Sequence, residues 1–124
     1  MALHVGIDIG STTTKVLVLD PSTQETLYSQ YRRHNAKQAH SVREALAVLQ
    51  ERFPDQQLCA ALCGSGSKGI AEALGVPYIQ EVVANSIAVR SLYPAARTAI
   101  ELGGQDAKMV FFRQDPTTGV LNVH

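Results

Sequence analysis

One sequence pattern occurs twice in this chain and limits the folds open to it more than any other feature. Residues 7–19, IDIGSTTTKVLVL, and residues 100–112, IELGGQDAKMVFF, match acid to acid, glycine to glycine and lysine to lysine. Each copy has two β-type runs separated by a polar turn that contains glycine, which is the pattern of a β-hairpin. The repeat predicts two acid-tipped hairpins that face one ligand, although glycine and β-branched residues are common enough in hairpins to allow a chance match.

Strand and helix patterns alternate along the rest of the chain. Strand patterns fall at 3–9, 16–19, 26–32, 58–63, 97–102, 108–112 and 119–123. Helical patterns fall at 41–53, 70–74 and 80–93. Ser41 and Glu44 read as a capping box at the start of the first helix, and Pro54 ends it. These patterns predict an α/β fold, with a mixed sheet flanked by helices, in a single domain over 1–124.

Composition excludes several classes of function. The chain has 124 residues, 45% of them hydrophobic, and a formal net charge of zero, which fits a globular domain. Basic and acidic residues are interspersed, so neither nucleic-acid binding nor membrane binding is predicted. No signal peptide or membrane span is recognisable, and we expect a cytoplasmic protein. Cys59 and Cys63 lie in an apolar run and are interpreted as inert core thiols.

The turn of the first hairpin has the chemistry of a phosphate site. It offers successive backbone amides, the flexible Gly10 and the ammonium of Lys15. Its hydroxyl residues are Ser11, Thr12, Thr13 and Thr14. Asp8 would repel a bare phosphate, so its presence predicts a divalent cation between the two groups. The second turn repeats the arrangement with Glu101, Gly103, Gly104, Gln105 and Lys108.

The segments DIGSTTTK and ELGGQDAK resemble the two phosphate motifs of the actin, sugar kinase and Hsp70 ATPase superfamily. The segment GGQDAK makes the resemblance more specific. It resembles the corresponding motif in the ATPase activators of 2-hydroxyacyl-CoA dehydratases and in related benzoyl-CoA reductase ATPase subunits. The resemblance covers nearly the whole chain and implies the first, RNase H-like lobe of an actin-like ATPase. In that family, ATP hydrolysis drives a low-potential electron from a 4Fe-4S cluster, shared between two subunits, into a partner dehydratase or reductase.

The resemblance also implies roles for individual residues. Asp8 and Glu101 would hold Mg²⁺, and the residues from Gly10 to Lys15 would bind the β- and γ-phosphates of ATP. Gly103 and Gly104 would approach the phosphates from the other lobe's side, and Gln105 would place the attacking water.

This sequence departs from the family pattern at several points. Glu101 stands where the family often has Asp. The family's cluster cysteines and adenosine-binding motif lie downstream of the second turn, and Cys59 and Cys63 do not match them. We therefore expect a fragment of a longer protein that retains the phosphate machinery. The alternative is a nucleotide-binding lobe of a sugar kinase-like or actin-like assembly protein without redox chemistry.

Four further features have simpler interpretations. The segment 64–69, GSGSKG, fits a dinucleotide fingerprint with Glu81 downstream, but the short helix after it favours a flexible loop near the site. Glu81 is interpreted as complementing a helix dipole. His34 and His40 have no partner at metal-ligand spacing and are interpreted as surface residues. Asp106 is either a turn residue or a metal or phosphate ligand.

Overall fold

The computed structural model describes residues 2–103, 107–114 and 121–123, and it divides into two compact units. The first unit comprises residues 1–79 and the second comprises residues 80–124. Each unit is described by itself below. The predicted single domain over 1–124 stays a prediction.

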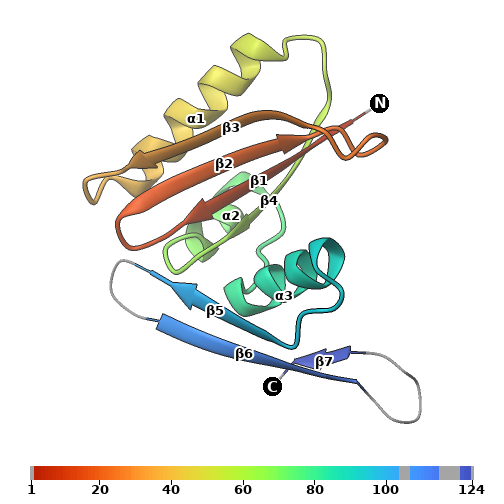
Figure 1. Cartoon of the computed structure of the whole chain (residues 1–124). Helices are drawn as coiled ribbons and strands as arrows, with labels where there is room; N and C mark the ends of the chain where they lie inside the picture. Colours follow the sequence, from red (N-terminus) through yellow and green to blue (C-terminus); the bar gives the residue numbers. More distant parts are fainter. Residues whose placement is uncertain (1, 104–106, 115–120, 124) are drawn as a thin grey trace. The chain divides into compact units, whose positions relative to one another are not determined.

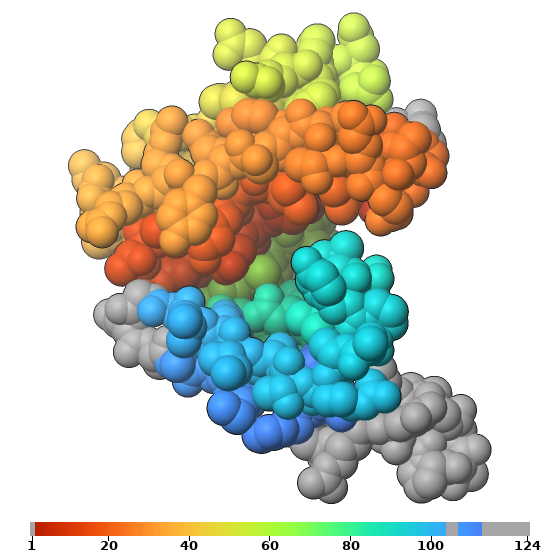
Figure 2. Space-filling view, viewed as in Figure 1, coloured from red at the N-terminus to blue at the C-terminus, as the bar shows by residue number. Residues whose placement is uncertain are grey.

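The first unit is built on a mixed four-stranded sheet (Figure 1). Its strands are β1 (Leu3–Ile9), β2 (Thr13–Leu19), β3 (Thr26–Arg33) and β4 (Leu58–Cys63). They lie in the order β3-β2-β1-β4, with β1 antiparallel to β2 and parallel to β4. β3 is an edge strand whose side chains are mostly exposed, and it appears in orange in Figure 2. The predicted α/β class and mixed sheet are confirmed.

A short segment beyond β4 extends this sheet by one parallel bridge. Leu62 pairs with Tyr78, and the Leu62 amide donates a 2.9 Å hydrogen bond to the carbonyl of Pro77. The amide of Ile79 in turn donates a 2.8 Å bond to the Leu62 carbonyl. The sequence indicated only a helix stop at Pro77, because a single bridge leaves no strand periodicity to recognise.

The helix α1 (Gln38–Arg52) packs on the sheet through one apolar stripe. Val42, Ala45 and Leu49 are buried at helical spacing and join the core with alternate residues of β1. The predicted capping box is wrong, since the helix begins at Gln38 and the amide of Ser41 already donates to the Lys37 carbonyl. The preceding turn, which sequence reasoning did not recognise, starts the helix one turn earlier.

The second unit contains one helix and an antiparallel sheet. Its elements are α3 (Glu81–Leu92), β5 (Thr98–Leu102), β6 (Ala107–Gln114) and β7 (Leu121–Val123), and the strand order is β5-β6-β7. Ile100 pairs with Met109 across this hairpin, and both side chains are exposed, as are those of Leu102 and Phe111. One face of the β5–β6 hairpin is therefore apolar and uncovered by the described residues.

The two cysteines do not both lie in the core. Cys59 is exposed and Cys63 is half-buried on β4, which follows α1 and precedes α2 (Lys68–Leu74). The core-thiol interpretation is therefore wrong for Cys59. The apolar run suggested burial on both faces, but Leu62 is the one residue of β4 that is fully buried. No helix among the described residues is long and apolar enough to cross a membrane.

Candidate functional site

The structure confirms that the repeated pattern forms two hairpins with one shared register. Asp8 faces Lys15 across the β1–β2 ladder, and Glu101 faces Lys108 across the β5–β6 ladder. The two copies of the pattern therefore agree in residue type and also in the pairing of acid with lysine. That the two hairpins face one ligand stays a prediction.

The carboxylate of Asp8 has one oxygen paired and one unpaired. Its Oδ2 lies 3.3 Å from the Lys15 ammonium, which also sits 5.6 Å from the centre of the Tyr31 ring. Its Oδ1 is buried and has no hydrogen-bond partner among the described residues. A buried carboxylate oxygen without a partner is costly, and a cation would satisfy it. Asp8 is therefore suited to be a ligand of a divalent cation.

Gly64, which sequence reasoning did not assign to the site, makes room for this carboxylate. It has a φ of +101°, and a Cβ added there would lie 2.6 Å from Asp8 Oδ1 and 2.3 Å from the carbonyl oxygen of Ile9. The next residues tie the loop down, because Gly66 donates to the Ile9 carbonyl at 3.3 Å and the buried Ser67 hydroxyl donates to the Gly64 carbonyl at 2.8 Å. The signal was a glycine directly after a strand.

The residues of the turn between β1 and β2 differ in their exposure to solvent. The amide of Gly10 donates a 2.9 Å hydrogen bond to the carbonyl of Thr13, which closes the turn. Ser11 and Thr12 are exposed, whereas Thr13 and Thr14 are buried. The hydroxyls that a ligand can reach from solvent are therefore those of Ser11 and Thr12.

The two histidines after β3 differ. His40 is exposed, as expected, and lies 2.9 Å from the Glu44 carboxylate. His34 is buried, with 5% of its surface exposed, so the surface interpretation is wrong for it. Its Nε2 lies 2.8 Å from the carbonyl oxygen of Gly10 in the phosphate-type turn. That contact joins residues 24 positions apart in the sequence, so no local sequence pattern predicts it.

The second unit carries a cluster of polar side chains around Glu101. The amide of Asn85 donates a 2.6 Å hydrogen bond to Glu101, and Lys108 lies 3.5 Å from the carboxylate of Glu81. A hydrogen bond with Glu81 raises the pKa of Glu101, helped by burial and by the charge of Glu81, while Asn85 and Lys108 oppose the rise. Glu81 therefore stands in the first turn of α3, as interpreted from the sequence, and also changes the pKa of Glu101.

Three of the remaining predicted site residues lie outside the described residues. These are Gly104, Gln105 and Asp106, while Gly103 is described and exposed. Within the described part of the chain, no three His, Cys, Asp or Glu side chains come together as a metal site. Asp8 alone would leave most positions around a cation to water and to a bound ligand.

A family model for the BadF/BadG/BcrA/BcrD ATPase family matches residues 5–119. The chain belongs to this family. No curated protein sequence matches it significantly. The predicted recognition of an activator-type ATPase is confirmed at the level of the family.

Several solved structures share the fold of this chain. Component A of (R)-2-hydroxyglutaryl-CoA dehydratase from Acidaminococcus fermentans matches with a TM-score of 0.75 and 20% identity over 99% of this chain and 46% of that chain. The activator of 2-hydroxyisocaproyl-CoA dehydratase from Clostridium difficile, with bound ADPNP, matches with a TM-score of 0.70 and 26% identity over 98% and 44%. A Ppx/GppA phosphatase from Aquifex aeolicus matches with a TM-score of 0.58 and 12% identity over 90% and 48%. The actin-like ATPase fold is thereby confirmed, and the chain spans less than half the length of these proteins.

Proposed function

We propose that this chain is the ATP-binding part of an activator that uses ATP hydrolysis to drive low-potential electron transfer into a 2-hydroxyacyl-CoA dehydratase or a related reductase. The observation that carries the proposal is the buried Oδ1 of Asp8, which has no partner among the residues described and lies just before a glycine- and hydroxyl-containing turn. Membership of an ATPase family and the likeness to two dehydratase activators, one with bound ADPNP, support it.

Several residues of the first hairpin have distinct parts in the proposed site. Backbone amides of the turn after Gly10, the exposed hydroxyls of Ser11 and Thr12, and the ammonium of Lys15 would bind phosphate oxygens. Asp8 would hold Mg²⁺, and the metal would neutralise part of the phosphate charge. Lys15 keeps the carboxylate of Asp8 in place through its 3.3 Å contact with Oδ2.

The second hairpin would complete the site. Glu101 is the second proposed metal carboxylate, and Gly103 with Gly104 would bring backbone amides to the phosphates. Gln105 would orient the attacking water. The contacts of Glu101 with Asn85 and Glu81 fix its carboxylate without relying on Lys108 alone.

The redox part of the proposal does not rest on the cysteines of this chain. Cys59 and Cys63 lie on one strand four residues apart, a separation of about 13 Å along β4, which is too far for one cluster. They do not fit a 4Fe-4S cluster, so cluster ligands, dimerisation and docking to the dehydratase belong in this proposal to the longer activator.

Titration of the full chain with ATP, followed by NMR, tests the nucleotide and metal parts of the proposal. The wild-type chain should bind ATP at least about tenfold more tightly with Mg²⁺ than with EDTA, because the metal bridges phosphate and carboxylate. Asp8→Asn should remove that difference.

Asp55→Asn provides the matched control. Asp55 is an exposed carboxylate in the turn before β4, and its removal should leave the Mg²⁺ dependence unchanged. Retention of the full Mg²⁺ effect in Asp8→Asn would contradict the proposed metal role.

A further inference from the structure

His34 connects the phosphate-type turn to the segment that follows β3. Its side chain is buried between them, and both ring nitrogens have partners. The amide of Ala36 donates a 3.1 Å hydrogen bond to Nδ1, and Nε2 lies 2.8 Å from the carbonyl oxygen of Gly10. The ring is therefore held from two sides.

These two partners select one tautomer of the ring. A backbone amide can only donate, so Nδ1 must carry a lone pair, and a carbonyl can only accept, so Nε2 must carry the hydrogen. The neutral Nε2–H tautomer is the one state that satisfies both contacts. A ring protonated at both nitrogens would lose the bond from Ala36.

The backbone of His34 holds the same turn at a second point. Its amide donates a 3.1 Å hydrogen bond to the carbonyl of Thr12, and its own carbonyl accepts a 2.8 Å bond from Lys37. Asn35 and Ala36 both have positive φ, at 50° and 62°, which turns the Ala36 amide back toward the ring. Two consecutive left-handed residues without glycine are uncommon, and these contacts hold them there.

Holding two carbonyls of the turn also orients two of its amides. Every peptide bond described here is trans, so each N–H points opposite to the carbonyl of the preceding residue in the same peptide unit. With the carbonyls of Gly10 and Thr12 fixed on His34, the N–H groups of Ser11 and Thr13 point away from it. These two amides belong to one turn, and neither is used by His34, so both are available to an anion.

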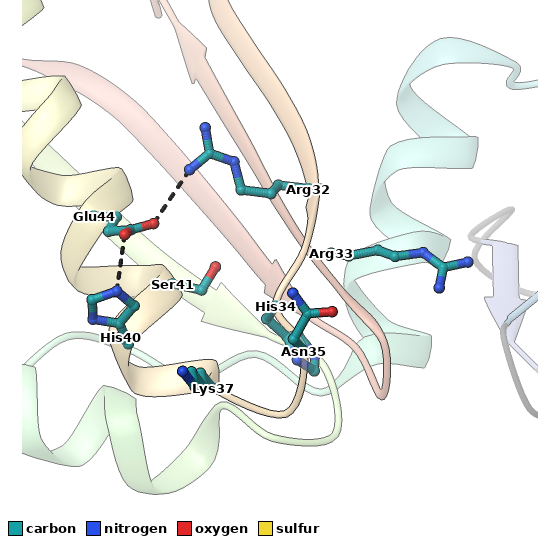
Figure 3. A pocket seen from close by; sticks show the side chains of 8 residues that line it. All are labelled: Arg32, Arg33, His34, Asn35, Lys37, His40, Ser41 and Glu44. Atoms are coloured by element: carbon teal, nitrogen blue, oxygen red, sulfur yellow. Dashed lines mark hydrogen bonds and ion pairs between the residues drawn. The ribbon is translucent and has the colours of Figure 1, made fainter.

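We propose that His34 is a positioning residue for phosphate binding, acting through the Gly10 carbonyl to aim the amides of the turn. The inference rests on the proposed function and adds to it a residue that touches neither nucleotide nor metal. His34 also lines a pocket of about 220 Å³ between the end of β3 and the start of α1, together with His40 (Figure 3).

Three substitutions separate the two contacts of the ring. In His34→Gln, the amide nitrogen can still donate to Gly10, while the bond from Ala36 is lost. In His34→Asn, the side-chain oxygen can accept from Ala36 two residues on, as in an Asx turn, while the bond to Gly10 is lost. His34→Ala removes both, and His40→Gln is the control in the same pocket.

The affinity for Mg-ATP should follow the Gly10 contact. We expect His34→Gln and His40→Gln to stay within about threefold of the wild type, and His34→Asn and His34→Ala to bind about tenfold more weakly. Thermal unfolding should instead follow the number of bonds lost, so Gln and Asn should lower the midpoint alike. Equal affinity loss in His34→Gln and His34→Asn, or wild-type affinity in His34→Asn, would overturn the inference.

Nitrogen-15 NMR of the imidazole tests the contact without nucleotide. The expected spectrum shows hydrogen on Nε2 and a lone pair on Nδ1, and a spectrum with hydrogen on Nδ1 and a lone pair on Nε2 would overturn the inference even if ATP binds. A wild-type chain with the expected tautomer that fails to bind Mg-ATP would instead disprove the proposed function, and the role of His34 in phosphate binding with it.

Discussion

The equivalent acids of the two hairpins are held in different ways. Asp8 has a lysine on one oxygen and no partner among the described residues on the other, whereas Glu101 shares a hydrogen bond with Glu81 and accepts another from Asn85. A carboxylate oxygen without a hydrogen-bond partner has lone pairs left for a cation, while a carboxyl beside another carboxylate favours its protonated form. The same position in a repeated motif thus acquires different chemistry from its neighbours.

The raised pKa of Glu101 predicts a pH effect on stability. Because the folded chain holds this proton more tightly than the unfolded chain, the stabilisation is complete below the ordinary pKa of 4.5 and is lost as pH rises through the raised folded value. Without Mg²⁺, Glu101→Gln should weaken this pH dependence and raise the unfolding temperature at pH 7 by about 1–3 °C, a small shift for a partly exposed pair.

Glu72→Gln, at an exposed position of α2, serves as the control for that measurement and should change neither quantity. A lower unfolding temperature in Glu101→Gln at pH 7 would mean that the charged carboxylate stabilises the fold.

At the scale of elements, the turn from β4 into α2 is shaped around the end of β1. Gly64 adopts a φ that side chains rarely tolerate and lies against Ile9, while Gly66 and Ser67 bond back to this corner. The segment that looked like a dinucleotide fingerprint therefore has a packing role at the Asp8 carboxylate.

Gly64→Ala should destabilise the chain by about 2–4 kcal/mol, combining backbone strain with overlap at 2.3 Å and 2.6 Å. Gly69→Ala is the matched control, since nothing lies within 4 Å of a Cβ there and the residue is helical. It should be neutral or stabilise by up to about 1 kcal/mol. Urea unfolding measures both, and equal stability of the two variants would contradict the close approach of Gly64 to β1.

At the scale of the whole molecule, the chain covers 46% and 44% of the two activators that it resembles. A nucleotide has a base and a ribose as well as phosphates, and closure of an enzyme site excludes water. We therefore expect these residues alone to bind Mg-ATP at about millimolar concentration, with negligible turnover. Calorimetry and a phosphate-release assay measure this, and micromolar binding with steady hydrolysis would contradict it.

The local pattern of the sequence was enough to predict most of the elements and both hairpins. The alternation in β1, the apolar run of β2 and the helical stripe of α1 each reflect backbone periodicity, which is a property of neighbouring residues. The pairing of acid with lysine across each hairpin was not predicted and is a finding of the structure. The start of α1 was missed because it depends on an irregular turn.

Tertiary structure alone decided what surrounds the predicted site residues. His34 meets Gly10, Gly64 meets Asp8 and Glu81 meets Glu101 only after separate segments pack together. Burial then changes the chemistry of each group, leaving one Asp8 oxygen without a partner in the described part of the chain and one histidine with a single tautomer that fits its contacts. The sequence by itself predicted candidate residues for phosphate binding, because residue type and turn chemistry are local. The fold determined which of their atoms are open to a ligand, because exposure depends on segments that are distant in the chain.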